Sequence, residues 1–311
     1  MVALDRIEAA LERSLRLCEG PSTPPGLIAA MRHAVFPGGG RLRPGLTLSV
    51  AMACKADARV SLDAQADVAA AMELMHCASL VHDDLPCFDD APLRRGRPSV
   101  HAAFGEELAV LAGDGLIILA YEVIAETNLP PSAVPKLIRC ISRGVGAGGG
   151  LVAGQAWESE RSVGLQTYHQ AKTGALFEAG ARAGAILAGA PQEPWAKFGA
   201  HLGEAYQVAD DLRDALGDAR ELGKPVGQDI AHNRPNACIS LGVDGAVNRL
   251  RALLDRAIDT IPACPEPDRV VDWVDSFAGR LYAGASKSKA PRPMASQSQA
   301  ANEPVAINLR A

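Results

Sequence analysis

Residues 76–98 read His-Cys-Ala-Ser-Leu-Val-His-Asp-Asp-Leu-Pro-Cys-Phe-Asp-Asp-Ala-Pro-Leu-Arg-Arg-Gly-Arg-Pro, a stretch in which four aspartates precede three arginines. The acids are Asp83, Asp84, Asp89 and Asp90, and the bases are Arg94, Arg95 and Arg97. Apolar residues recur at helical spacing from residue 66 to 81, so the first two acids fall at the C-terminal end of a helix, where carboxylates oppose the helix dipole. A bound cation relieves that cost. Carboxylate oxygens with room for water suit Mg²⁺, and arginines bind phosphate through paired hydrogen bonds.

Pro86 decides whether these acids can share one site. On an unbroken helix, Asp83 and Asp89 would point about 240° apart around the axis. Proline removes a backbone donor and disfavours helical geometry at Leu85, so the chain leaves the helix there and can bring Asp89 back beside Asp83. Taken alone, the stretch is also compatible with a solvated acidic helix end.

A second acidic cluster lies in residues 204–214, Glu-Ala-Tyr-Gln-Val-Ala-Asp-Asp-Leu-Arg-Asp. Asp210 and Asp214 are four residues apart and share one helix face, with Gln207 a turn before them. Like charges at this spacing repel each other, and a cation is the simplest relief. Lys224 follows in Leu-Gly-Lys-Pro. Two such clusters in one chain favour a metal site over a solvated helix end.

Together these residues resemble the two aspartate-rich motifs of the trans-isoprenyl diphosphate synthase family. The first motif reads DDxxxxD and is followed by LRRGRP, and the second reads DDxxD. The resemblance covers roughly residues 5–283 and extends through FPGGGRLRP at 36–44, GQ at 154–155, KTG at 172–174 and GKPVGQD at 223–229. It implies the isoprenoid synthase fold, an all-α single-domain bundle of antiparallel helices around a central cavity.

Composition agrees with a helical enzyme. The 311 residues are 48% hydrophobic but only 4% aromatic, which favours close-packed helices over sheets. A net charge of −5 gives no electrostatic footprint for nucleic acid. The N-terminus lacks a hydrophobic signal core, and no run of 18 apolar residues predicts a membrane span, so we expect a cytoplasmic protein. We expect one domain over residues 1–283 and a disordered tail over residues 284–311, where Ser, Lys, Pro, Gln and Ala prevail.

The resemblance also implies a role for each matching residue. Mg²⁺ would be held by Asp83, Asp84, Asp89, Asp210, Asp211 and Asp214. Catalytic contacts to the allylic diphosphate and its departing pyrophosphate would come from Lys172, Thr173, Gln207 and Lys224, with Arg94 beside the metal. Isopentenyl diphosphate would be held by Arg41, His76 and Arg95. In the resembled family a Lys-Arg pair in the glycine-rich loop holds this second diphosphate; here Gly40 replaces the lysine, Arg41 and Arg43 remain, and we expect the role at Arg41.

Product length should depend on the helix before Asp83, because the growing chain must run down a slot beside the first motif. One and two turns before Asp83 stand Ser79, Ala78 and Met75. The two small residues leave the upper slot open, and Met75 is the expected floor for a twenty-carbon product. The pattern is similar to geranylgeranyl-forming members of the family that feed carotenoid and bacteriochlorophyll pathways, and a homodimer is implied.

Three alternatives remain open. A farnesyl diphosphate synthase would differ only in pocket depth. A class I terpene cyclase would place Ser or Thr at position 214 and Glu at 218, whereas the chain has Asp214 and Asp218. A non-catalytic regulatory subunit of a prenyl synthase could lose metal ligands. This chain keeps both triads, and Gly40 is the one feature in favour of that alternative.

Overall fold

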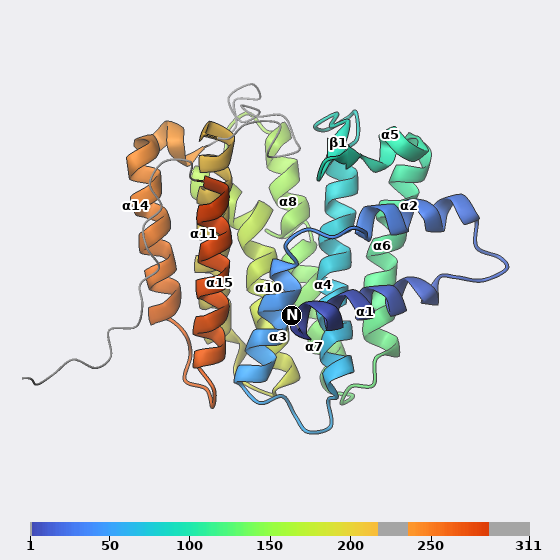
Figure 1. Cartoon of the computed structure of the whole chain (residues 1–311), viewed down its shortest axis with the longest axis horizontal. Helices are drawn as coiled ribbons and strands as arrows, with labels where there is room; N and C mark the ends of the chain where they lie inside the picture. The colour runs from blue at the N-terminus through green and yellow to red at the C-terminus, as the bar shows by residue number, and fades with distance from the viewer. Residues whose placement is uncertain (1, 217–235, 286–311) are drawn as a thin grey trace, which may run out of the picture.

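The computed structural model describes residues 2–216 and 236–285 of the chain, and in these ranges it is a bundle of long helices (Figure 1). The longer helices are α1 Val2–Leu17, α2 Pro25–Val35, α3 Leu42–Ala53, α4 Leu62–Asp83, α6 Glu106–Glu126, α7 Val134–Val145, α10 Ala175–Leu187, α11 Gln192–Leu216, α14 Ala237–Asp259 and α15 Asp268–Ala285. Short elements are β1 Leu93–Arg94, β2 Arg97–Pro98, α5 Val100–Phe104, α8 Leu151–Ala156, the 3₁₀-turn Trp157–Ser159, α9 Leu165–His169 and the π-helical turn Gln170–Gly174. The expected all-α architecture is confirmed.

Helix α4 is the centre of the first half of the bundle. Ser61 caps its start by accepting a hydrogen bond from the Ala64 amide at 3.0 Å. Its side chains are buried almost all the way round, as its Ala-rich sequence allows, because α1, α3, α6 and α10 pack against it. This burial fixes the position of the helix end at Asp83.

A second apolar cluster holds α11, α14 and α15 together with α3 and α10. Its large buried side chains include Phe177, Trp195, Phe198 and Phe277. Glycines let the backbones approach closely: a Cβ on Gly184 would lie 2.6 Å from the Thr47 carbonyl oxygen of α3, and one on Gly203 would lie 2.4 Å from the Gly174 Cα. The low aromatic and high Ala and Gly content therefore serves helix-to-helix contact.

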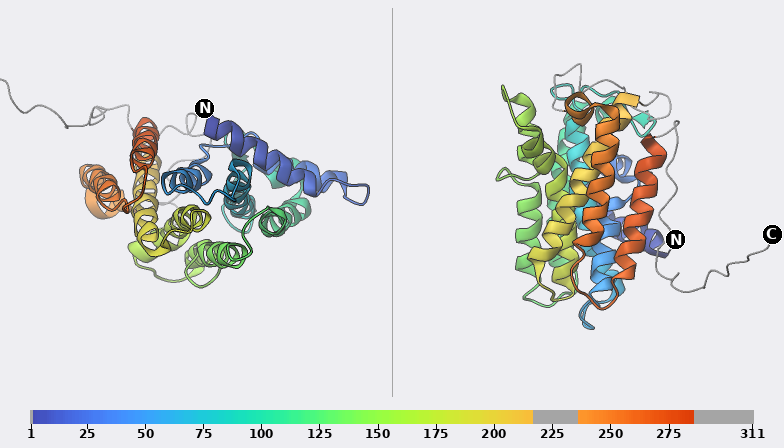
Figure 2. Two further views of the ribbon diagram at one scale, coloured as in Figure 1. Left: turned by 90° about the horizontal axis from the view of Figure 1, so that it is seen from below. Right: turned by 90° about the vertical axis from the view of Figure 1, so that its left-hand side faces the viewer.

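From α3 onward the consecutive long helices run in opposite directions, whereas α1 and α2 lie across them, so α4 and α11 both end at the same edge of the bundle (Figures 1 and 2). The two-stranded hairpin of β1 and β2 stands over the end of α4, where Arg95 and Gly96 turn with positive φ. Both aspartate-rich motifs thereby reach one end of the molecule.

Helix α6 is, among the described residues, long and apolar enough to cross a membrane, by length and composition alone. Its most apolar window has a mean hydropathy of 2.0 and is 44% buried, mainly against α4 and α2. Val110, Leu111 and Ile118 remain exposed on this helix. Its buried face, which packs against α4 and α2, is that of a core helix.

Some expectations fall outside the described residues. Lys224, the GKPVGQD motif and Asp218 lie within residues 217–235, and the expected tail lies outside from residue 286 onward. The proposed domain limit at residue 283 stays a prediction.

Candidate active site

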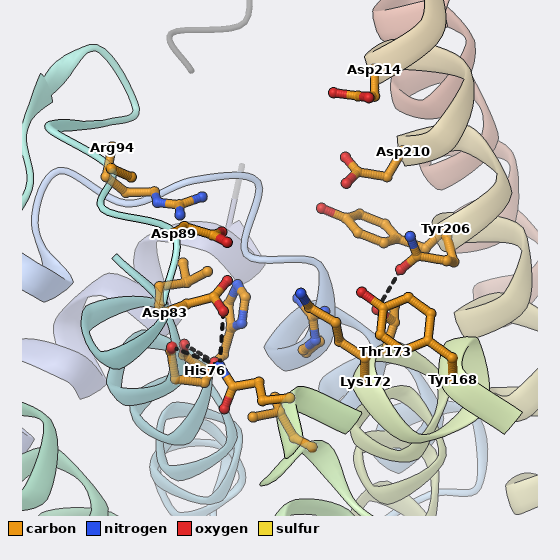
Figure 3. Close-up of a pocket in the computed structure, with 17 residues that line it drawn as sticks. His76, Asp83, Asp89, Arg94, Tyr168, Lys172, Thr173, Tyr206, Asp210 and Asp214 are labelled. Atoms are coloured by element: carbon orange, nitrogen blue, oxygen red, sulfur yellow. Dashed lines mark hydrogen bonds between the residues drawn. The ribbon is translucent and has the colours of Figure 1, made fainter. Parts of the chain in front are cut away.

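A cavity of about 200 Å³ opens between the C-terminal parts of α4 and α11 (Figure 3). It is lined by Arg43, His76, Ser79, Leu80, Asp83, Asp89, Ala91, Arg94, Leu151, Gln155, Tyr168, Lys172, Thr173, Tyr206, Gln207, Asp210 and Asp214. In Figure 3, Asp83 and Asp89 face Asp210 and Asp214 from opposite walls, with Lys172 below them. Two clusters of carboxylates that lie far apart in sequence thus face each other across one cavity.

The turn after α4 brings the first carboxylates together. The helix ends at Asp83, and after Pro86 the chain folds back so that the Asp89 amide donates to the Asp83 carbonyl at 3.0 Å. Carboxylate oxygens of Asp83, Asp89 and Glu158 lie within 4.8 Å of one another. The expected return of Asp89 to Asp83 is confirmed.

Glu158 is a site residue that the sequence roles did not include. It belongs to the 3₁₀-turn after α8, accepts a hydrogen bond from the Tyr168 hydroxyl at 2.6 Å, and forms an ion pair with Lys172. The signal in the sequence was the acid that follows GQ in Gly-Gln-Ala-Trp-Glu. Three oxygen donors at this spacing can hold a metal ion that prefers oxygen ligands.

Asp84 differs from its neighbour, because its carboxylate is turned to the hairpin. It is 2% exposed and binds Arg94, whose Nε donates to it at 2.9 Å, and it does not line the cavity. Burial raises the pKa of Asp84, although Arg94 opposes that shift. In this structure Asp84 positions Arg94 at the cavity edge, and its expected role as a metal ligand stays a prediction.

Asp211 is likewise turned away from the cavity. It is buried, accepts from the Ala237 amide at 2.7 Å and from Gln207 Nε2 at 2.9 Å, and lies 3.5 Å from His169 Nε2. These contacts join α11 to the start of α14. Of the second motif, Asp210 and Asp214 line the cavity and Asp211 contacts the start of α14, and the expected ligand role of Asp211 stays a prediction.

Lys172 and Thr173 lie in the π-helical turn Gln170–Gly174, where one widened turn interrupts the helix. Such turns are frequent at functional sites. Thr173 Oγ1 donates to Gln207 Oε1 at 2.8 Å, which links the turn to α11. Gly154 lets α8 lie against this turn, because a Cβ there would be 2.3 Å from the Lys172 backbone. Lys172, Thr173 and Gln207 therefore reach the cavity as expected.

Arg41 has a buried side chain that forms ion pairs within the protein. It adopts a left-handed conformation with φ of 47°, is almost fully buried, and binds Glu8 and Glu73 at 2.8 and 2.9 Å. These carboxylates raise its pKa above the usual arginine value in spite of its burial. Its guanidinium thus already has carboxylate partners in this structure, and the expected role of Arg41 in holding isopentenyl diphosphate stays a prediction.

Arg43, two residues later, lines the cavity instead. Its side chain stacks over Phe177 and Tyr206, with distances of 4.8 and 5.4 Å to the ring centroids. It is 6% exposed, and its Nε has no hydrogen-bond partner within the described part of the chain. Burial lowers the pKa of Arg43. A buried guanidinium without a carboxylate partner calls for an anion.

His76 also lines the cavity, and its Nδ1 is buried without a hydrogen-bond partner in the described residues. Burial lowers its pKa well below the usual value, and Arg43 and Arg95 lower it further. At neutral pH the imidazole is therefore uncharged and can donate a hydrogen bond without adding a charge.

Of the expected chain-length residues, only Ser79 lines the cavity, together with Leu80 and Leu151. Ala78 and Met75 are 1% exposed and belong to the apolar core. Gln155 Nε2 donates to the Ser79 carbonyl at 3.2 Å and to Asp83 at 3.3 Å, so the floor and the carboxylates are connected. The floor of the cavity is thus set by α4 and α8 together.

Comparisons with known proteins agree with this geometry. The family model described as polyprenyl synthetase matches residues 24–268. Geranylgeranyl diphosphate synthase from Cereibacter sphaeroides is 50% identical over 277 residues, covering 89% of this chain and 95% of the relative. Farnesyl diphosphate synthase from Geobacillus stearothermophilus is 38% identical, covering 81% and 86%. A Helicobacter pylori geranyltransferase, solved in complex with magnesium and isoprenyl diphosphate, superposes with a TM-score of 0.74 at 28% identity, covering 90% and 98%.

Proposed function

Because the chain belongs to the polyprenyl synthetase family and is a prenyltransferase, we propose that it condenses isopentenyl diphosphate with allylic diphosphates to form geranylgeranyl diphosphate. The observation that carries this proposal is that two clusters of carboxylates face each other across one cavity, which has positively charged side chains at its edge. The 50% identity to a geranylgeranyl diphosphate synthase supports the twenty-carbon product over the fifteen-carbon one.

The donor set fits Mg²⁺, because it consists of carboxylate oxygens with open space beside them. Asp83, Asp89 and Glu158 would hold it on one wall, and Asp210 and Asp214 on the other. Bound there, Mg²⁺ would neutralise negative charge on the diphosphate group as it leaves the allylic substrate.

The remaining residues of the cavity bind and orient the substrates. Lys172 and Thr173 reach the diphosphate of the allylic substrate from below the carboxylates, and Lys224 keeps its expected role there as a prediction. Uncharged His76 and the cations Arg43 and Arg95 bind isopentenyl diphosphate. When the allylic carbon–oxygen bond breaks, the alkene of isopentenyl diphosphate attacks the resulting allylic cation, and loss of a proton restores a double bond. The released pyrophosphate can accept that proton, so no protein base is assigned.

Turnover with separate primers tests the proposal. The purified chain is incubated with Mg²⁺, isopentenyl diphosphate and dimethylallyl, geranyl or farnesyl diphosphate, and product lengths are measured by chromatography. A dominant twenty-carbon product supports the proposal. A fifteen-carbon stop favours the farnesyl diphosphate synthase alternative, and no product from any primer favours the regulatory subunit.

Ser79→Phe is expected to shorten the main product. Ser79 lines the floor, so a phenyl ring there fills the space that the tail of a twenty-carbon chain needs. We expect the fifteen-carbon product to become dominant while turnover of dimethylallyl diphosphate falls by less than about tenfold, because the carboxylates are unchanged. Ala78→Tyr, which places its ring in the core beside this floor, is expected to act in the same direction. Unchanged product lengths in both variants would contradict the assignment of the floor.

We also propose a homodimer that forms through α6, acts in the cytoplasm and supplies carotenoid or bacteriochlorophyll synthesis. The dimer proposal is supported by the exposed apolar side chains Val110, Leu111 and Ile118 of this helix. The location and pathway rest on the sequence resemblance.

Ile118→Glu is expected to convert the dimer to a monomer, because it places a charge within the apolar contact. Ile118 is 66% exposed, and Ile239 on α14 is 62% exposed, so Ile239→Glu is a matched control away from α6. Light scattering coupled to size-exclusion chromatography measures the mass. A wild-type monomer, or equal loss of dimer in both variants, would contradict the proposed interface.

A further inference from the structure

The glycine-rich loop Gly38–Gly40 is approached by guanidinium groups from several segments. A Cβ on Gly39 would lie 3.0 Å from the Arg95 guanidinium, which comes from the hairpin. A Cβ on Gly40 would lie 3.7 Å from Arg280 Nη1, which comes from α15. Arg280 Nη1 also donates to the Gly40 carbonyl at 2.6 Å, so the C-terminal helix is tied to this loop.

The arginines around the loop fall into two groups. Arg41 and Arg94 are bound by the carboxylates of Glu8, Glu73 and Asp84. Arg43, Arg95 and Arg280 have no carboxylate within 4.0 Å in the part of the chain that the structure describes. The first group stabilises the fold, and the second group leaves three positive charges available to a ligand.

A second cavity of about 240 Å³ lies beside Arg43 and Arg95, and Arg280 contacts its lining through the Gly40 carbonyl. Gly39, Gly40, Arg43 and Arg95 line it, and it adjoins the first cavity, with which it shares Arg43 and His76. Its lining carries five arginines against two acids, Glu73 and Asp210, so positive charge prevails there, and the buried guanidinium of Arg43 has lost its hydration. An anion in this cavity relieves both costs.

We propose that Arg280 binds the diphosphate of isopentenyl diphosphate together with Arg43 and Arg95, and that it supplies the charge that residue 40 does not. This inference rests on the proposed function. The bond to the Gly40 carbonyl uses one guanidinium N–H and fixes the group at the loop, which leaves its other N–H groups for phosphate oxygens. The position of the charge, on a helix far along the chain, makes α15 part of the substrate site.

The space around residue 40 allows the positive charge of Arg280 to be replaced by a lysine at position 40. The nearest atom to a Cβ there is Leu42 Cγ at 3.4 Å, an ordinary contact, so the backbone of Gly40 can carry a side chain. If Arg280 acts through its charge at this loop, Gly40→Lys should replace it when Arg280 is removed. If Arg280 serves only to hold α15 through the carbonyl bond, a lysine at position 40 cannot compensate.

The experiment compares wild type with Arg280→Ala, Arg280→Lys, and the double variant Gly40→Lys with Arg280→Ala. Arg269→Ala is the matched control, because it removes one positive charge from the other end of α15, where Arg269 pairs with Glu266. Steady-state kinetics give KM for isopentenyl diphosphate, KM for the allylic substrate and kcat. Isothermal titration calorimetry gives the dissociation constant of isopentenyl diphosphate without turnover.

For Arg280→Ala we expect KM and the dissociation constant for isopentenyl diphosphate to rise about tenfold, with the allylic KM and kcat changed less than about twofold. The double variant and Arg280→Lys should recover most of that loss, and Arg269→Ala should resemble wild type. Unchanged binding in Arg280→Ala, or a loss that Gly40→Lys does not recover, would overturn the proposal. A wild type that binds isopentenyl diphosphate but forms no product would contradict the proposed function and leave the binding comparison valid.

Discussion

We expect Asp83→Asn to lower kcat by on the order of 10³-fold and to leave the fold intact. Asparagine has the shape of aspartate and keeps an oxygen that can accept the hydrogen bond from Gln155 Nε2. It removes one negative charge from the group formed with Asp89 and Glu158. Because the group must hold a cation against a departing diphosphate, the loss should appear mainly in the chemical step and in metal affinity.

Rates at several Mg²⁺ concentrations and thermal unfolding of the variant measure these effects. Asp90→Asn is the matched control, because Asp90 is exposed on the same turn, makes the same charge change, and has a positive φ that asparagine tolerates. We expect the control to keep wild-type kinetics and the Asp83 variant to need more Mg²⁺ for half-maximal rate. A loss of similar size in both variants would point to general electrostatics of the turn and contradict the assigned site.

The location of the first site could be predicted from the sequence because it depends on local rules. Helical periodicity placed Asp83 at a helix end, and Pro86 required the chain to leave the helix there. The hydrogen bond from the Asp89 amide to the Asp83 carbonyl follows from that departure. The i and i+4 spacing of Asp210 and Asp214 likewise placed both on one face.

The directions of the Asp84 and Asp211 side chains could not be predicted, because they depend on partners distant in sequence. Asp84 differs from Asp83 by one position, which turns its side chain to Arg94 of the hairpin. Asp211 differs from Asp210 in the same way and meets the Ala237 amide of α14. A motif gives residue types and spacing, whereas the direction of each carboxylate depends on which helix packs beside it.

Arg41 shows a similar limit of prediction from the sequence, here for a residue that follows a loop. Its left-handed backbone conformation and its two carboxylate partners, Glu8 of α1 and Glu73 of α4, come from tertiary packing. Arg43 lies in the first turn of α3 and faces the cavity. The two arginines look equivalent in Gly-Arg-Leu-Arg-Pro, and they differ in that Arg41 has carboxylate partners whereas Arg43, among the described residues, has none and lines the cavity.

Arg41→Met should therefore lower the stability of the protein, whereas Arg43→Met should weaken substrate binding. Removing Arg41 leaves Glu73, which is 2% exposed, as a buried carboxylate without its ion pair, and we expect a loss of about 3–5 kcal/mol in the free energy of unfolding. Removing Arg43 takes away a buried cation that has no carboxylate partner within the described residues, so stability should stay within about 1 kcal/mol of wild type. Its loss should instead raise KM for isopentenyl diphosphate about 100-fold, since a charge-assisted contact to the diphosphate disappears.

Chemical denaturation and steady-state kinetics on both variants separate these effects. Methionine preserves much of the apolar stem of arginine, so contacts with Phe177 and Tyr206 are partly kept in the Arg43 variant. The double variant Arg41→Met with Glu73→Gln is the control for the first effect, because it removes the orphaned charge and should recover part of the lost stability. If Arg43→Met were the unstable variant and Arg41→Met the one with impaired binding of isopentenyl diphosphate, the two guanidinium groups would have been assigned in reverse. The sequence expectation for Arg41 would then hold against the geometry.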